Sequence, residues 1–194
     1  MNRHIAITGG IGSGKSYVCK LLQQRGISVY DCDAAAKRLM ATSVELQNEL
    51  SQLVGSEVFA DGKLNKPIMA KFLLASDENR LAINNIVHPA VASDYMQSGI
   101  EWIESAILFD SGFDQRLPLT AIVCVTAPLT VRISRIMQRD NISKEQAEEW
   151  IAQQMPQDEV ARLSNYVIVN DGESDLDQQI ESILSDIYSK TEGV

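Results

Sequence analysis

The sequence has 194 residues, of which 45% are hydrophobic and 22% charged, with a formal net charge of −9 at pH 7. This length suits one α/β core with an inserted subdomain. The negative charge argues against a nucleic-acid-binding surface, because binding a polyanion requires excess Lys and Arg on one face. No apolar run approaches the ~18 residues that a membrane helix needs, and glycines after Thr8 interrupt any signal-peptide core. We therefore expect a cytoplasmic protein whose partners include neither nucleic acid nor a membrane.

The three cysteines do not form the pattern of a disulfide framework or a zinc site. No two of the residues Cys19, Cys32 and Cys124 are separated by the C-x-x-C spacing that such sites usually show. The sequence therefore predicts reduced, mostly buried thiols, the usual state of cysteine in the cytosol.

A strand and a glycine-rich loop occupy the first sixteen residues. Ile5–Thr8 is a short apolar run of strand character, and residues 9–16 (GGIGSGKS) satisfy the phosphate-loop pattern G-x-x-x-x-G-K-[ST]. Apolar residues at helical spacing follow, until Gly26 offers a helix stop. The motif therefore has the strand-to-helix setting that it needs, and a plain glycine-rich turn explains the pattern less well.

The residue types in this loop suit the binding of a nucleoside triphosphate. Glycine lets the backbone turn its N–H groups toward a pyrophosphate without strain. The helix that starts near Gly14 adds unpaired amides and the positive end of its dipole. Lys15 supplies a full charge at the β- and γ-phosphates, and the Ser16 hydroxyl is a natural magnesium ligand.

A long helical block interrupts the strands after the first βαβ pattern. Ile27–Tyr30 is predicted to be the second strand. Helices are then expected at Ala34–Met40, Val44–Leu53, Pro67–Leu74, Glu78–Val87 and Pro89–Met96, with Ser76 as an N-cap and His88-Pro89 at a helix junction. A block of this length is too long for a simple crossover, so we interpret it as an inserted helical subdomain.

The sheet is expected to resume after this insertion. Further strands are predicted at Ser105–Phe109, Thr120–Thr126 and Asn165–Val169, and further helices at Leu129–Gln138, from a capping box at Ser143 and Gln146 to about Met155, and at Leu176–Tyr188. This alternation predicts a parallel sheet with helices on both faces.

Three carboxylates follow predicted strands. Asp31 and Asp33 come after the second strand, and in an extended chain residues two apart face the same way, so both could point into one pocket. A carboxylate there could accept the hydroxyl proton of a phosphoryl acceptor. The alternative is a pair of solvated aspartates or an N-cap for the helix at Ala34. Asp110, at the end of the third strand, is either a carboxylate near a magnesium ion or an ordinary strand-end residue.

Most of the remaining polar and aromatic candidates have ordinary structural explanations. Arg132 and Arg135 share a helix face and are expected to be solvated or paired with carboxylates. Trp102 and Trp150 are expected to pack rather than to stack on bases, and a lone His88 is usually structural. Arg139 differs, because it leads into a polar segment that could close over a γ-phosphate and bring in a cation.

The motifs together resemble the dephospho-CoA kinase family. They are TGGIGSGKS (Thr8–Ser16), D-x-D (Asp31 and Asp33), H-P (His88) and Q-R-D (138–140), and the resemblance extends from Ile5 to Gly172. It implies a P-loop NTPase fold of three α/β/α layers with a five-stranded parallel sheet. It also implies a nucleotide-binding core (1–33, 104–138 and 164–194), a helical CoA-binding insertion (34–103) and a lid (139–163).

The resemblance implies the last step of coenzyme A synthesis, in which ATP with Mg²⁺ phosphorylates the ribose 3′-hydroxyl of dephospho-CoA. We expect a monomer with these two small-molecule substrates. By position, Lys15, Asp33 and Arg139 would be catalytic, with Asp33 the general base and Arg139 the lid arginine. The acceptor would lie near Thr8, Asp33 and His88, and the metal at Ser16. Nucleotide-binding residues would be Gly10, Ile11, Gly12, Ser13, Gly14, Lys15, Ser16 and Tyr17.

Several positions depart from the family pattern. Tyr17 stands where Thr is common, and Ala106 and Asp110 stand where Pro and Glu are common. In the lid, Val160 occupies a position where Lys is frequent, and Arg162 remains. The lid is therefore expected to carry few cations.

Two other functions are compatible with a phosphate loop. A different small P-loop kinase, acting on a nucleotide, nucleoside or sugar acid, would share the core and the lid but not the 34–103 insertion with its D-x-D. A GTP-dependent switch or ATPase module would hydrolyse nucleotide without an acceptor. The chain contains neither the N-K-x-D nor the D-x-x-G pattern of guanine-specific switches.

Overall fold

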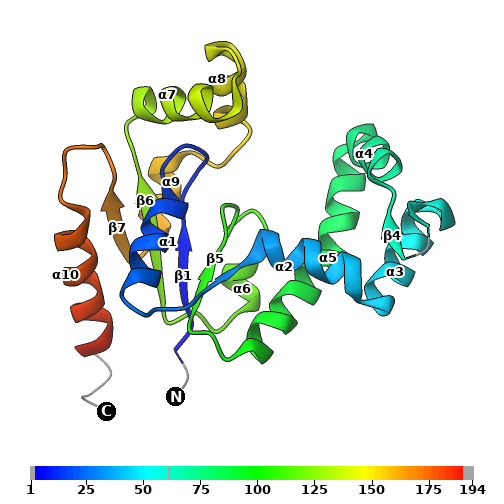
Figure 1. Ribbon diagram of the computed structural model, residues 1–194, viewed down its shortest axis with the longest axis horizontal. Coiled ribbons are helices and arrows are strands. Elements are labelled where there is room, and N and C mark those ends of the chain that lie inside the picture. The colour runs from blue at the N-terminus through cyan, green and yellow to red at the C-terminus, as the bar shows by residue number, and fades with distance from the viewer. Residues whose placement is uncertain (1–2, 61, 190–194) are drawn as a thin grey trace. The chain divides into compact units, whose positions relative to one another are not determined.

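Five parallel strands form the central sheet of the chain; β1, β5, β6 and β7 are labelled in Figure 1. The computed structural model describes residues 3–60 and 62–189. In the order β2-β5-β1-β6-β7, the strands are β2 (Val29–Asp31), β5 (Trp102–Glu104), β1 (Ile5–Thr8), β6 (Ala121–Thr126) and β7 (Tyr166–Val169). The predicted α/β class and five-stranded parallel sheet are confirmed.

The central strands are apolar because both faces of the sheet are covered. Ile5 of β1 lies opposite Trp102 of β5 and Ala121 of β6 in the parallel register. Ile5, Ile7 and Val123 are fully buried. The loop that follows Thr8 therefore begins at the carboxyl end of an immobilised strand.

Six helices complete this part of the described chain: α1 (Lys15–Gln24), α6 (Phe113–Arg116), α7 (Leu129–Asp140), α8 (Lys144–Ala152), α9 (Gln157–Leu163) and α10 (Leu176–Ser189). Helices α1 and α10 lie side by side (Figure 1) and share one core with the sheet, in which Val18 and Leu22 pack with Ile180 and Ile187. The indole of Trp102 donates to the Tyr188 hydroxyl at 3.2 Å, so Trp102 is a packing residue as predicted.

The chain divides into two compact units, the first made of Met1–Tyr30 with Ile100–Val194 and the second of Asp31–Gly99. The second unit contains α2 (Cys32–Thr42), α3 (Val44–Val54), the 3₁₀ turn η1 (Ser56–Val58), the hairpin β3 (Phe59–Ala60) with β4 (Lys63–Leu64), α4 (Lys66–Ala75) and α5 (Asp77–Ser98). Helix α5 contacts α2, α3 and α4. The small hairpin was not predicted.

Two predictions of helix and strand boundaries are wrong, one inside the second unit and one in the segment that follows it. His88-Pro89 does not join two helices, because Pro89 lies inside the continuous 22-residue helix α5. Proline removes one backbone hydrogen bond there, and packing against three neighbouring helices outweighs that loss. Ser105–Phe109 is not a strand either, since β5 ends at Glu104 and residues 106–110 form a turn. The apolar run resembles a strand in sequence because the turn also buries an apolar side chain, that of Leu108.

The remaining expectations differ in outcome. Ser76 caps α5 by accepting from the Asn79 N–H at 3.2 Å, and the Ser143–Gln146 capping box is present. The helix predicted to reach Met155 ends at Ala152, and α9 follows it. In the described residues none of the three cysteines forms a disulfide and all three are buried, as predicted. Burial raises the pKa of Cys124 to about 11. Among the described helices, none is long and apolar enough to cross a membrane.

Candidate active site

The glycine-rich loop turns directly from β1 into α1. Gly14 is the N-cap of α1 with a left-handed φ of 86°, and the helix starts at Lys15. The first N–H groups of a helix have no partner within it, and they carry the positive end of its dipole. Ser16 and Tyr17 are exposed on the first turn. The loop and the start of α1 therefore present the donors that a phosphate chain requires.

Lys15 forms an ion pair with Glu104, the last residue of β5. The two side chains are only 10% and 14% exposed, so the pair is largely shielded from solvent. Glu104 was missed because the third strand was predicted to begin one residue after it. The overlooked signal is a carboxylate at the carboxyl end of a strand, where ligands of parallel sheets bind.

Ile11 is held in place from three sides. The Arg132 Nε donates to its carbonyl oxygen at 2.9 Å, and its own N–H donates to the Gln154 Oε1 at 2.8 Å. Its side chain packs against the cluster formed by Ile133, Ile136 and Ala147. Hydrogen bonds therefore connect the tip of the loop to α7, through Arg132, and to the segment that follows α8, through Gln154.

A second group of contacts holds the far side of the loop. Arg135 Nη1 donates to the carbonyl oxygens of Ser13 and Asn170, at 3.3 Å and 3.1 Å. Asn170, buried at the end of β7, donates from Nδ2 to the Ser13 carbonyl oxygen at 3.0 Å. The expectation that Arg132 and Arg135 are solvated or paired with carboxylates is wrong, because both side chains bind backbone carbonyls of the loop.

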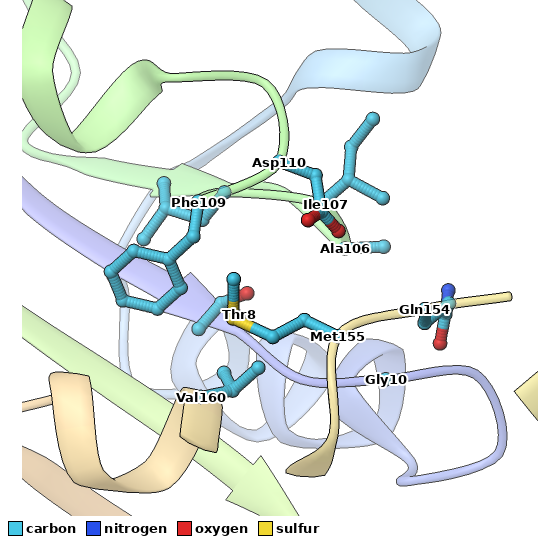
Figure 2. A pocket seen from close by; sticks show the side chains of 10 residues that line it. Thr8, Gly10, Ala106, Ile107, Phe109, Asp110, Gln154, Met155 and Val160 are labelled. Carbon is cyan, nitrogen blue, oxygen red and sulfur yellow. The ribbon is translucent and has the colours of Figure 1, made fainter. Parts of the chain in front are cut away.

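A pocket opens beside the loop (Figure 2). Thr8 and Gly10 form one side of it, the turn from Ala106 to Asp110 forms another, and residues on either side of Pro156 close it: Gln154, Met155 and Val160. Its lining is mostly apolar, and Val160 contributes no charge. Asp110 belongs to this turn and not to a strand end, so the basis for predicting a strand-end carboxylate is wrong.

The other candidates lie on α7 and in the second unit. Arg139 is exposed in the last turn of α7 and pairs with Asp140 at 2.7 Å. Asp31 is the N-cap of α2, and its carboxylate accepts from the Ala34 N–H at 2.9 Å. Asp33 is therefore in the first turn of α2, so the interpretation in which both aspartates lie in an extended chain and face one pocket is wrong. The alternative of an N-cap is confirmed for Asp31. His88 is partly buried within α5.

Gly14 should tolerate no side chain. A β-carbon there would overlap Asn170 Nδ2 and would require a left-handed residue at φ +86°. We expect Gly14→Ala to lower the free energy of unfolding by about 2–4 kcal/mol, from backbone strain plus the lost Asn170–Ser13 hydrogen bond. Urea denaturation of Gly26→Ala is the control, because Gly26 has φ +79° and a β-carbon added there would meet no atom within 4 Å. Equal losses in both variants would contradict the importance of the Asn170 contact.

The sheet, the loop and the α1 N-terminus define a P-loop NTPase fold. Solved structures have the same fold: a shikimate kinase from Acinetobacter baumannii (TM-score 0.57, 15% identity) covers 97% of this chain and 94% of its own. A dephospho-CoA kinase from Campylobacter jejuni reaches a TM-score of 0.67 at 20% identity, covering 98% and 100%. TT1252 from Thermus thermophilus reaches 0.78 at 32% identity, covering 95% and 97%.

Sequence comparison identifies the family. Residues 3–175 match the family described as dephospho-CoA kinase. The dephospho-CoA kinase of Bacteroides fragilis (strain YCH46) is 42% identical over 193 residues, covering 96% of this chain and 93% of that protein. That of Porphyromonas gingivalis (strain ATCC BAA-308 / W83) is 34% identical, covering 96% and 95%. The chain belongs to the dephospho-CoA kinase family, and it is an ATP-dependent kinase.

Proposed function

We propose that this chain transfers the γ-phosphoryl group of ATP to the ribose 3′-hydroxyl of dephospho-CoA, which yields ADP and CoA. Family membership supports the reaction, and the observation that carries it is the buried Lys15 at the junction of the loop and α1. A lysine in that position can reach the β- and γ-phosphates. The transferring group then meets a fixed charge whose surroundings exclude water, where electrostatic stabilisation is strongest.

Lys15 has to exchange one anionic partner for another during this reaction. In the structure Lys15 is paired with Glu104. When a triphosphate enters the loop, the ammonium group turns to the phosphate oxygens and the Glu104 carboxylate is released. Until then, the ion pair keeps a buried charge from standing alone, which would be costly.

The residues near the loop fit a magnesium ion. Mg²⁺ prefers hard oxygen ligands and keeps several waters, and the Ser16 hydroxyl and the Glu104 carboxylate are such ligands. In the described residues, no group of three or more His, Cys, Asp and Glu side chains could hold a metal by itself. The remaining ligands would therefore be phosphate oxygens and water. When bound, the ion would neutralise charge on the β- and γ-phosphates.

The roles of the other residues follow the sequence predictions. Residues 10–17 would bind the ATP phosphates, Arg139 would approach the γ-phosphate by leaving Asp140, and Asp33 would accept the proton of the 3′-hydroxyl. Thr8, which lines the pocket beside the loop, and His88 would contact the acceptor. Residues 34–103 would bind the CoA moiety and residues 139–163 would act as the lid. We also propose a monomer that works in the cytoplasm without nucleic acid.

The reaction can be tested by measuring ADP release from ATP with Mg²⁺. Dephospho-CoA is compared with adenosine, AMP and gluconate as acceptors, and the product is identified by mass spectrometry. Of these four acceptors, we expect only dephospho-CoA to support turnover, and we expect CoA as the product. Turnover with another acceptor would replace the substrate within the same fold, and acceptor-independent hydrolysis would indicate a switch or ATPase module.

A further inference from the structure

A buried arginine, Arg132, lies against the backbone of the loop. Arg132 is only 5% exposed although its side chain ends in a permanent charge. Its Nε donates to the Ile11 carbonyl oxygen at 2.9 Å. In the described part of the chain, no carboxylate forms an ion pair with it. Burial lowers the pKa of this guanidinium, which reflects the cost of keeping the charge away from water.

The position of the guanidinium is defined by Gly10. A β-carbon on Gly10 would lie 2.6 Å from Arg132 Nη2 and 3.0 Å from Gln154 Oε1. The charged end of Arg132 therefore covers the side of Gly10 that has no side chain, directly against the backbone of the phosphate loop. A larger residue than glycine would displace it.

Two arginines beside the loop are bound to neutral acceptors. The charge of Lys15 is balanced by Glu104, whereas Arg135 binds the carbonyl oxygens of Ser13 and Asn170 and the Asn170 side chain. Arg132 and Arg135 thus add two cationic groups bound to neutral acceptors, in a chain with a net charge of −9. Buried charges are normally paired or lie where a ligand supplies the opposite charge.

We propose that Arg132 is a further nucleotide-binding residue, whose buried guanidinium supplies a fixed positive charge to the polyphosphate in the loop. The inference rests on the proposed function for the identity of the anion. Arg132 acts from the wall of the loop while it holds the Ile11 carbonyl, so its charge needs no reorganisation when the nucleotide enters. An interaction of this kind grows with the number of phosphates on the ligand.

The alternative is a purely mechanical role, in which Arg132 only fixes the shape of the loop. Two variants separate charge from shape. Arg132→Lys keeps the charge but loses the guanidinium hydrogen-bonding geometry, whereas Arg132→Gln keeps an N–H donor and loses the charge. Arg116→Gln, at an exposed arginine of α6, controls for the change in net charge.

The experiment measures the Kd of ATP and of AMP by calorimetry, together with the urea unfolding of each variant. We expect Arg132→Gln to weaken ATP binding roughly 10–100-fold and AMP binding much less, because the charge acts on the phosphate chain. Arg132→Lys keeps the charge, so it should weaken ATP binding clearly less than Arg132→Gln does. Arg116→Gln should leave both Kd values unchanged. Raising the salt concentration should change the difference between Arg132→Gln and the wild type little, because salt screens a buried charge much less than an exposed one.

Two results would overturn the proposal. Equal losses for Arg132→Lys and Arg132→Gln would assign a mechanical role, and equal losses for AMP and ATP would show that the charge does not act on the phosphate chain. Because binding is measured without an acceptor, the outcome is independent of the reaction. A wild type that binds ATP but fails to phosphorylate dephospho-CoA would refute the proposed acceptor and leave the Arg132 result intact.

Discussion

Replacing Lys15 with alanine is expected to raise the barrier for phosphoryl transfer by about 3–4 kcal/mol, the typical loss for a preorganised electrostatic donor. In the proposed reaction, the ammonium group would act where negative charge redistributes in the transition state, and Lys15 is buried. Steady-state kcat and kcat/KM with ATP and dephospho-CoA measure the effect. A variant that keeps a near wild-type kcat would refute the role of Lys15.

The ion pair with Glu104 gives this prediction a matched control. Lys15→Ala also leaves the Glu104 carboxylate without its lysine partner in a site where it is 14% exposed, and repulsion between that carboxylate and the phosphates could by itself weaken ATP binding. The double variant Lys15→Ala, Glu104→Gln removes this charge. If activity returns in the double variant, the loss came from the carboxylate, whereas a persistent loss of kcat assigns it to the missing ammonium group.

Asp33→Asn is expected to lower kcat about 10²–10⁴-fold with little change in the affinity for ATP, as for a positioned general base. The amide can still accept a hydrogen bond but cannot take up the proton of the 3′-hydroxyl. Single-turnover phosphorylation of dephospho-CoA, combined with equilibrium binding of ATP, separates the chemical step from binding. A loss of ATP affinity that accounts for the whole effect would contradict the assignment.

Asp31 supplies the control for that experiment. Its carboxylate caps α2 at the Ala34 N–H, and asparagine is an equally good N-cap. Asp31→Asn should therefore preserve the helix and retain most of the activity. If Asp31→Asn proves the more damaging change, the base is Asp31 and the capping contact is given up during the reaction.

The elements with a strong local signal were predictable from the sequence. The phosphate-loop motif fixes its own strand and helix, and β6 is recognisable as a nearly continuous apolar run. Caps such as Ser76 and Ser143 are defined by residues three apart, so nothing distant is needed to predict them. The same reasoning located Lys15 at the start of α1.

Features that depend on distant residues were not predictable. Arg132 and Arg135 look like an exposed charged face because the loop they bind is more than a hundred residues earlier in the chain. Glu104 was missed because the apolar run after it looks more like a strand than β5 does. Pro89 normally breaks a helix, and only the packing of α5 against three others explains its continuation.

The interleaving of the two units sets an order for folding during synthesis. Residues 31–99 are contiguous, so the second unit can collapse as soon as it has emerged. The first unit has to wait, because Ile5 of β1 pairs with Trp102 and Ala121. At ordinary rates of translation, β1 would spend on the order of ten seconds without strand partners. Strand β1 is therefore an apolar segment that stays exposed to aggregation until its partners have been synthesised.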